Sequence, residues 1–164
     1  MMQMNIYTVQ AEEAPERIVE KKVRSVSVGR EDVKRETEQY LVQQYTNELG
    51  ELFCQICQAP LPFKLEDGGY YFEKVEFLAE LKRRHLRNYL CLCPNHSAMF
   101  LYANGSKNVL KNLFAEMAGE RMEIILAQSN AVIYFTKTHL ADLKDVIEQD
   151  EKEQSSLTKG SDNS

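Results

Sequence analysis

The sequence predicts an α+β fold: an N-terminal helix, a strand–strand–helix unit, and then a helix, a β-hairpin and a C-terminal helix. Apolar residues recur at helical spacing in residues 30–49, and short β-favouring runs flank turn residues further on. The 164 residues, 43% of them hydrophobic, suffice for one domain with a core. We expect that domain over 30–150, after a weakly structured extension (1–29) and before a disordered polar tail (151–164).

The first helix is predicted over residues 30–49, between Gly29 and Gly50. Glycine often follows the last helical residue, because it adopts the left-handed conformation there without strain. The stripe that would face the core consists of Val33, Tyr40, Leu41, Gln44, Tyr45 and Leu49.

The middle of the chain contains two short strands. Residues 70–77 are aromatic and partly alternating, which is typical of a strand, and the tight turn 67–69 precedes them. Residues 78–87 are predicted as an exposed helix and residues 88–93 as the second strand. Pro94 ends that strand, and a helix is expected over 95–102.

The last third predicts a helix, a hairpin and a helix. Apolar residues lie on one side of a helix over 106–117. Residues 121–128 and 131–135 read as a hairpin that turns at Ser129-Asn130. Thr136 or Thr138 is expected to cap a final helix that ends near Glu148. We expect the hairpin to pack on the helices before and after it.

The four cysteines point to metal binding or free thiols. No apolar run is long enough to cross a bilayer, and residues 1–10 do not resemble a secretory signal. These features predict a cytoplasmic protein, where disulfide frameworks are rare.

The spacing of those cysteines predicts a zinc site. Zinc in structural sites takes four thiolate or imidazole ligands at the corners of a tetrahedron. Cys54 and Cys57 form a C-x-x-C turn, and Cys93 and His96 form a C-x-x-H pair where a strand turns into a helix. The alternative is a set of buried thiols, but it leaves the paired spacing unexplained. We therefore expect one structural Zn²⁺ per chain.

Cys91 stands outside this set. It lies two residues before Cys93, and a straight strand would point both side chains to one face, where they cannot easily grip one ion. Cys91 is interpreted as a small buried hydrophobe.

Residues 51–104 resemble the zinc-stabilised HNH endonucleases. The resemblance rests on Cys54–Cys57, on Tyr71-Phe72-Glu73 and most specifically on residues 88–100. It implies a strand–strand–helix (ββα-metal, or treble-clef) unit clamped by two ligand pairs, in a protein of bacterial type. More loosely, residues 62–64, 68–73 and 132–136 resemble C-terminal regions of large bacterial proteins that carry an Hsp90-like or sacsin-like ATPase; no nucleotide-binding motif accompanies them here.

The chain departs from the HNH pattern at the catalytic positions. Active members carry histidines on the first strand and directly after the His of the C-x-x-H pair, and these supply the general base and a ligand of the catalytic metal. Here the strand reads Glu73-Lys74-Val75-Glu76-Phe77, and Ser97 follows His96. The resemblance therefore implies a module without nuclease activity, so no catalytic residue is assigned and the protein is predicted not to be an enzyme.

Nucleic-acid contact is the next hypothesis. The net charge of −5 argues against strong non-specific binding by the whole chain. One basic cluster offers candidate contacts, although an ordinary solvated helix face is the favoured interpretation. Its members are Lys82, Arg83, Arg84, His85 and Arg87. The aromatic residues 70–72 can stack on bases, but filling a small core is the favoured interpretation.

We assign no catalytic or metal-binding role to the remaining candidate residues. His139 is expected to cap or border the last helix at the surface. Glu73 and Glu76 are three apart on a strand, so they face opposite sides and cannot share a metal.

Three functions remain open. The preferred one is a non-catalytic zinc module that contacts DNA or a protein, with no membrane partner. The others are a metal-dependent nuclease that uses His85, Glu73 or Glu76, and an interaction module of a larger bacterial ATPase system.

Overall fold

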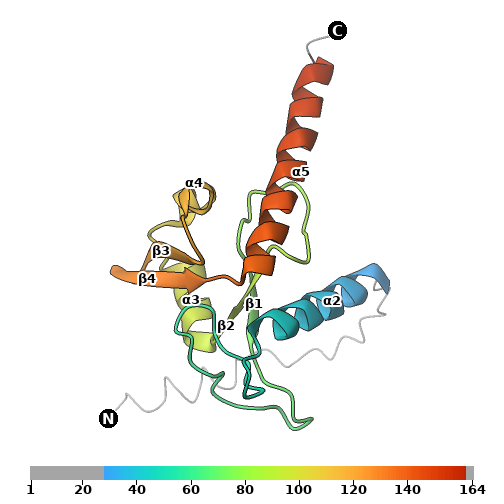
Figure 1. The fold of residues 1–164 in the computed structure, drawn as a ribbon. Coiled ribbons are helices and arrows are strands. Elements are labelled where there is room, and N and C mark those ends of the chain that lie inside the picture. Colours follow the sequence, from blue (N-terminus) through green and yellow to red (C-terminus); the bar gives the residue numbers. More distant parts are fainter. Residues whose placement is uncertain (1–27, 162–164) are drawn as a thin grey trace, which may run out of the picture.

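The computed structural model describes residues 28–161 and has the predicted α+β architecture, with helices at both ends and two antiparallel hairpins between them (Figure 1). The expectation for residues 1–29 lies almost wholly outside the described residues. The helices are α2 (Val28–Tyr45), α3 (Pro94–Tyr102), α4 (Leu110–Glu116) and α5 (Lys137–Ser161), with a short 3₁₀ turn η1 (Lys107–Val109) before α4. The strands are β1 (Glu73–Glu76), β2 (Tyr89–Leu92), β3 (Arg121–Leu126) and β4 (Ser129–Tyr134).

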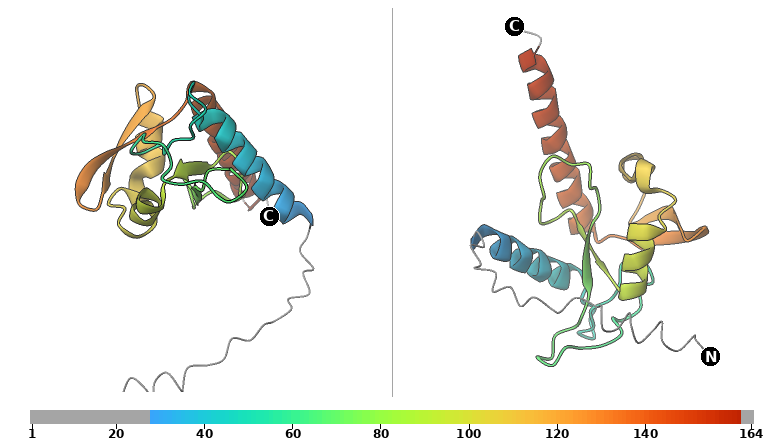
Figure 2. Two further views of the ribbon diagram at one scale, coloured as in Figure 1. Left: turned by 90° about the horizontal axis from the view of Figure 1, so that it is seen from below. Right: turned by 180° about the vertical axis from the view of Figure 1, so that it is seen from behind.

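The first hairpin, β1–β2, lies between two helices, with α2 on one side and α3 on the other (Figures 1 and 2). Its register pairs Lys74 with Cys91 and Val75 with Leu90. Val75, Leu90 and Leu92 face the main core, whereas Cys91 packs with Leu41 and Tyr45 of α2 in a second core. Because both faces are covered, β2 is almost continuously buried and does not alternate between polar and apolar residues.

The second hairpin has one buried face. Met122, Ile124 and Leu126 of β3 are buried, and the residues between them are exposed. These buried side chains join Leu110 and Phe114 from the α4 side, and Leu143 and Val146 of α5, in the main core. The expected packing of the hairpin on the helix before it is therefore confirmed, and the helix after it contributes to the same core.

The turn of this hairpin differs from the prediction. Ser129 and Asn130 belong to β4, and the two turn residues are Ala127 and Gln128, with φ of 48° and 64°. Both are in the left-handed region, as a two-residue hairpin turn requires. The turn-favouring character of Ser and Asn was misleading, because register is set by the buried faces of the strands.

The predicted helix over 78–87 is absent, and these residues form a loop. Asn88 is buried and binds both backbone groups of Leu78: its Oδ1 accepts from Leu78 N at 3.0 Å, and its Nδ2 donates to Leu78 O at 2.8 Å. Lys82 N donates to Asp150 Oδ1 of α5 at 2.9 Å. Backbone groups that a helix would pair internally are thus bound by side chains from elsewhere.

Both terminal helices end at unexpected places. α2 stops at Tyr45, because Asn47 Oδ1 accepts from the N–H groups of Leu49 and Glu51; Leu49 is therefore exposed, as is Val33. α5 begins after Thr136, whose Oγ1 accepts from His139 N at 3.1 Å, and continues to Ser161 instead of ending near Glu148.

The expected disordered tail is therefore helical over 151–161. Ion pairs from Glu151 to Lys111 and from Glu153 to Arg83 hold part of this extension against the rest of the molecule. Beyond them α5 projects from the body (Figure 1).

Candidate metal centre

The C-x-x-C pair lies on a tight turn between α2 and the first hairpin. Cys54 N donates to Ala59 O at 3.1 Å, and Gln58 N donates back to Cys54 O at 2.8 Å. Gln58 adopts a left-handed conformation with φ of 57°. Ile56 N points at Cys54 Sγ, 3.4 Å away, so a backbone donor supports the sulfur that would bind a cation. Cys54 is buried and Cys57 is exposed.

The C-x-x-H pair lies at the start of α3. Cys93 is the residue before the helix, and Pro94 occupies its first turn, where the missing N–H costs no hydrogen bond. His96 N donates to Cys93 Sγ at 3.5 Å. One turn of helix therefore points both the thiol and the imidazole at the C-x-x-C turn.

The four predicted ligands converge on one point. Cys54, Cys57, Cys93 and His96 each present a ligand atom within 4.8 Å of the other three. His96 Nδ1 lies 3.8 Å from Cys54 Sγ and 3.3 Å from Cys93 Sγ. Zn–S bonds of about 2.3 Å and Zn–N bonds of about 2.05 Å place S and N about 3.6 Å apart in a tetrahedron. The group can therefore hold one metal ion with little rearrangement.

Burial determines the protonation states of two of these ligands. It raises the pKa of the Cys54 thiol to about 12, although backbone N–H groups act in the opposite direction. Burial lowers the pKa of His96, which favours the neutral imidazole, the form that binds metals. A cation at the centre of the group is the charge that would favour the Cys54 thiolate.

Cys91 takes no part in the group. Its side chain points to the α2 side of the hairpin, where Sγ donates to Phe53 O at 3.6 Å. Burial raises its pKa far above the ordinary value, so it stays a neutral thiol. Cys93 escapes the strand alternation that we expected to pair it with Cys91, because β2 ends at Leu92. The interpretation of Cys91 as a buried hydrophobe agrees with this placement.

Gln55 is the residue that sequence reasoning missed. It lies inside the C-x-x-C turn and is fully buried. Its backbone N donates to Cys91 O at 2.9 Å, and its Oε1 accepts from Cys91 N at 2.8 Å. On the other side its Nε2 donates to Tyr134 O at 2.9 Å, and its carbonyl accepts from Tyr134 N at 2.8 Å. Gln55 therefore joins the C-x-x-C turn to both hairpins. In the sequence, the only signal for this role is a glutamine placed between the two cysteines.

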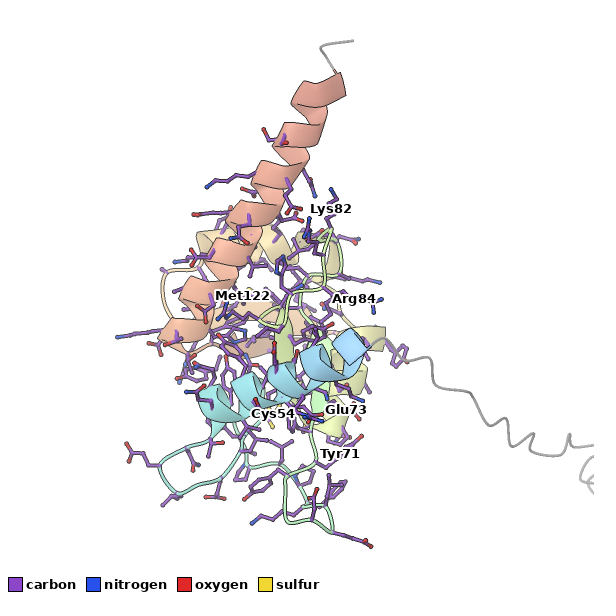
Figure 3. All side chains as sticks on the ribbon, turned by 90° about the vertical axis from the view of Figure 1, so that its right-hand side faces the viewer. Cys54, Tyr71, Glu73, Lys82, Arg84 and Met122 are labelled. Carbon is purple, nitrogen blue, oxygen red and sulfur yellow. The ribbon has the colours of Figure 1, made fainter. Side chains whose placement is uncertain are left out.

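The basic cluster does not form one surface. Arg83 pairs with Glu153 at 3.3 Å, and Arg87 pairs with Asp142 at 3.4 Å while its guanidinium lies over the Tyr40 ring. Lys82 lies beside α5, whereas Arg84 lies toward the N-terminal end of α2 (Figure 3). His85 is half-buried. Two of the five candidate contacts are therefore paired with acidic residues of α5.

His139 is buried in the core, so its expected surface position is wrong. Its Nε2 lies 2.8 Å from Arg87 O and its Nδ1 lies 2.5 Å from Tyr45 Oη. A carbonyl only accepts, so Nε2 carries the proton and the Tyr45 hydroxyl donates to Nδ1. Burial lowers the pKa of His139 to about 4. His139 thus links α2, α5 and the 77–88 loop as a neutral imidazole.

The remaining candidates have structural roles. Glu73 accepts a hydrogen bond from Tyr71, and Glu76 lies on the other face of β1, near Arg84, so the two glutamates do not meet. Tyr70 and Phe72 pack against the second core, and Tyr71 stacks on Phe63. Tyr70 and Phe72 therefore help to fill a core, which is the interpretation that the sequence favoured over base stacking.

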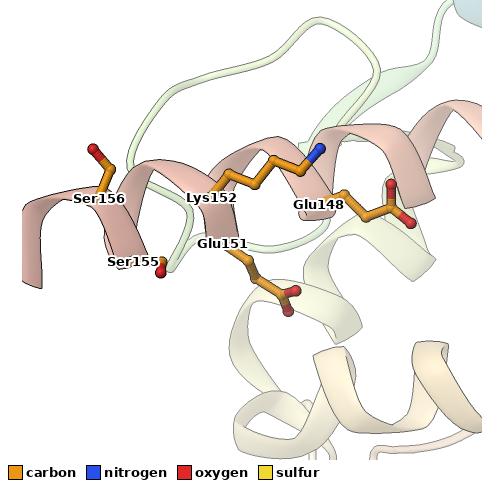
Figure 4. A pocket seen from close by; sticks show the side chains of 5 residues that line it. All are labelled: Glu148, Glu151, Lys152, Ser155 and Ser156. Atoms are coloured by element: carbon orange, nitrogen blue, oxygen red, sulfur yellow. The ribbon is translucent and has the colours of Figure 1, made fainter. Parts of the chain in front are cut away.

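A shallow hollow runs along one face of α5 and does not form a site (Figure 4). All its lining residues come from that single helix, and one of them, Glu151, already pairs with Lys111. No donor from a second element lines it.

Comparison of the chain with family models, with curated proteins and with solved structures gives no match. In the described part of the chain, no helix combines the length and the apolar character needed to span a bilayer.

Proposed function

We propose that the Cys54, Cys57, Cys93 and His96 group binds one structural Zn²⁺ and that the module it clamps is non-catalytic. The carrying observation is the convergence of three cysteine sulfurs and one imidazole within 4.8 Å. Soft thiolate ligands with an imidazole favour zinc over magnesium or calcium, which take oxygen ligands. Four protein ligands leave no open position for water or substrate, as in structural and not catalytic zinc sites.

Zinc would act through folding. β1 and β2 pair over only four residues each, and long irregular segments connect them to the ligand turn. Such a unit buries little surface by itself, so metal binding would supply part of its folding free energy. Gln55 would carry that stabilisation to the second hairpin through its bonds to Tyr134.

Within this proposal, the chain is an inactive relative of the HNH endonucleases. In its support, the chain runs from a C-x-x-C turn through an antiparallel hairpin to a helix that begins with the second ligand pair. Against cleavage, β1 carries no histidine and Ser97 is buried. A general base would then have to be a carboxylate of β1, but Glu73 accepts a hydrogen bond from Tyr71 and Glu76 lies beside Arg84. We propose that the module contacts DNA or a protein partner, as a component of a larger assembly.

Elemental analysis of the purified full chain tests the zinc proposal. We expect one zinc per chain in the wild type and a loss of zinc in Cys54→Ser. Cys91→Ala is the matched control, since it removes a cysteine of the same segment that is not a ligand, and it should retain one zinc. Absence of zinc from protein purified without chelator, or equal loss in both variants, would contradict the proposal.

A nicking assay on plasmid DNA with Mg²⁺ or Mn²⁺ tests the non-catalytic part. We expect no cleavage above a no-protein control. Cleavage that disappears in His85→Ala, Glu73→Gln or Glu76→Gln would overturn it and favour a nuclease with altered catalytic residues.

A further inference from the structure

A pocket of about 630 Å³ lies where α2 crosses the outer face of the first hairpin. It is on the α2 side of that hairpin, the side on which Lys74 and Tyr89 point, whereas the metal ligands converge at the start of α3. Four segments contribute to its wall, namely α2, β1, β2 and the 77–88 loop. The lining residues are Val33, Lys34, Thr37, Lys74, Arg84 and Tyr89.

The lining is cationic. Lys34, Lys74 and Arg84 come from three different segments, and no carboxylate lines the pocket. Two carboxylates stand close by. Glu38 pairs with Lys74. Burial raises the pKa of Glu76, and the nearby Arg84 charge acts in the opposite direction. Lys34 has no ion-pair partner among residues 33–156, whose side chains the structure describes. Three positive and two negative groups therefore leave one uncompensated positive charge at the pocket.

The other groups of the wall suit a ligand with both a charged and a flat part. The Thr37 hydroxyl already donates to Val33 O at 2.8 Å. The remaining donors are Lys34, Arg84, the Tyr89 hydroxyl and the Lys74 N–H groups that Glu38 does not use. Burial raises the pKa of Tyr89, which keeps that hydroxyl protonated and able to donate. The half-buried Tyr89 ring and the Val33 side chain offer apolar surface beside these donors.

We propose that this pocket binds a phosphate group carried by a nucleotide, either free or within a single strand of nucleic acid. A guanidinium binds phosphate through two parallel N–H donors, and ammonium groups add point charge around it. An aromatic ring beside the phosphate site can stack on a base. The volume lies within the range of small-molecule sites. This site is separate from the metal ligands, and of the dispersed basic cluster it includes only Arg84.

Titration of the zinc-containing full chain by ¹⁵N NMR tests the proposal, with ATP and an eight-residue oligothymidylate as probes. Both should shift the amide signals of Lys34, Lys74, Arg84 and Tyr89, and added salt should weaken both. Lys34→Gln and Arg84→Gln should each weaken binding about tenfold, since a hydrogen bond to a charged group contributes about 1.5 kcal/mol or more. Arg121→Gln is the charge-matched control on the exposed face of β3 and should leave the affinity unchanged.

The outcomes are distinct. An oligothymidylate affinity at least tenfold above that of ATP supports the site and identifies nucleic acid as the source of phosphate; equal affinities support it with a free nucleotide as the source. The proposal is overturned by absence of shifts at millimolar probe, by equal weakening in Arg121→Gln, or by citrate that binds as tightly as ATP. Any of these with one zinc still bound per chain leaves the metal proposal standing.

Discussion

The two hairpins differ in what stabilises them. β3–β4 has six-residue strands and one buried face that rests on α4 and α5. β1–β2 has four-residue strands, helices on both faces, and at its base four side chains that could hold a metal ion. The second hairpin is held by one apolar face, whereas the first is buried on both faces and, in our proposal, is also cross-linked by zinc. A small β-unit can thus be held either by one good hydrophobic face or by cross-links at its ends.

Gln55 shows that the two hairpins are not independent. It bonds to Cys91 of β2 and to Tyr134 of β4, so the metal-binding turn touches both. Four predictions test how far the contrast between them holds, in order of expected effect.

Removal of zinc should have the largest effect and should act mainly on the first hairpin. We expect chelation at neutral pH to lower the free energy of unfolding by about 5 kcal/mol or more. Amide hydrogen exchange shows which hairpin loses stability. The amides of Leu90 and Leu92 should lose more protection than those of Met122 and Ile124. Equal loss in the two hairpins would mean that Gln55 couples them into one cooperative unit.

Truncation of Phe135, the residue directly after β4, should remove apolar packing and leave the metal centre intact. Phe135 is fully buried, and its ring makes edge contacts with Phe77, Phe114 and His139 at centroid distances of 5.4–5.8 Å. Phe135→Ala should cost about 4 kcal/mol by urea denaturation, with zinc content unchanged. Ile125→Ala, on the exposed face of the same hairpin, should cost less than about 1 kcal/mol. Loss of zinc in Phe135→Ala would contradict the view that apolar packing and metal binding stabilise the protein independently.

Acid should destabilise the His139 network, which joins α2 and α5 across the first hairpin. The neutral imidazole is favoured in the folded chain, where the pKa is about 4 against an ordinary 6.5. Its stabilisation is complete above pH 6.5 and is lost as pH falls toward 4. A shift of about 2.5 units at about 1.36 kcal/mol per unit amounts to about 3 kcal/mol.

The zinc ligands also respond to acid, so a variant must separate the two effects. His139→Gln should lower stability at pH 7 and flatten the dependence on pH between 6.5 and 4, both measured in saturating zinc. An unchanged slope in the variant would assign the acid sensitivity to the metal centre alone.

The smallest effect is expected at the turn of the second hairpin. Gln128 is left-handed, which costs a non-glycine residue about 1 kcal/mol. Gln128→Gly should therefore raise the free energy of unfolding by up to about 1 kcal/mol. Ser129→Gly, one residue later and inside β4, should lower it by about 0.5 kcal/mol or more. Calorimetric melting compares the two directly, and a gain in both variants would contradict the conformational explanation.

The sequence by itself determined the features that depend on spacing over a few residues. The two ligand pairs are visible because C-x-x-C and C-x-x-H each place two donors on one turn, and the structure brings all four together. The alternation of β3 is local in the same sense, and so is the start of α5, which the sequence narrowed to a cap at Thr136 or Thr138. The fold class followed from these periodicities.

Only the tertiary structure decided the features that depend on partners far along the chain. Residues 78–87 form a loop because Asn88 and Asp150 bind their backbone, and Arg83 and Arg87 face α5 because its carboxylates lie there. His139 is buried because Tyr45 and Arg87 O satisfy both of its nitrogens. A hydrogen bond across 50 to 100 residues leaves no periodic trace in the sequence, since either partner alone looks like an ordinary polar residue.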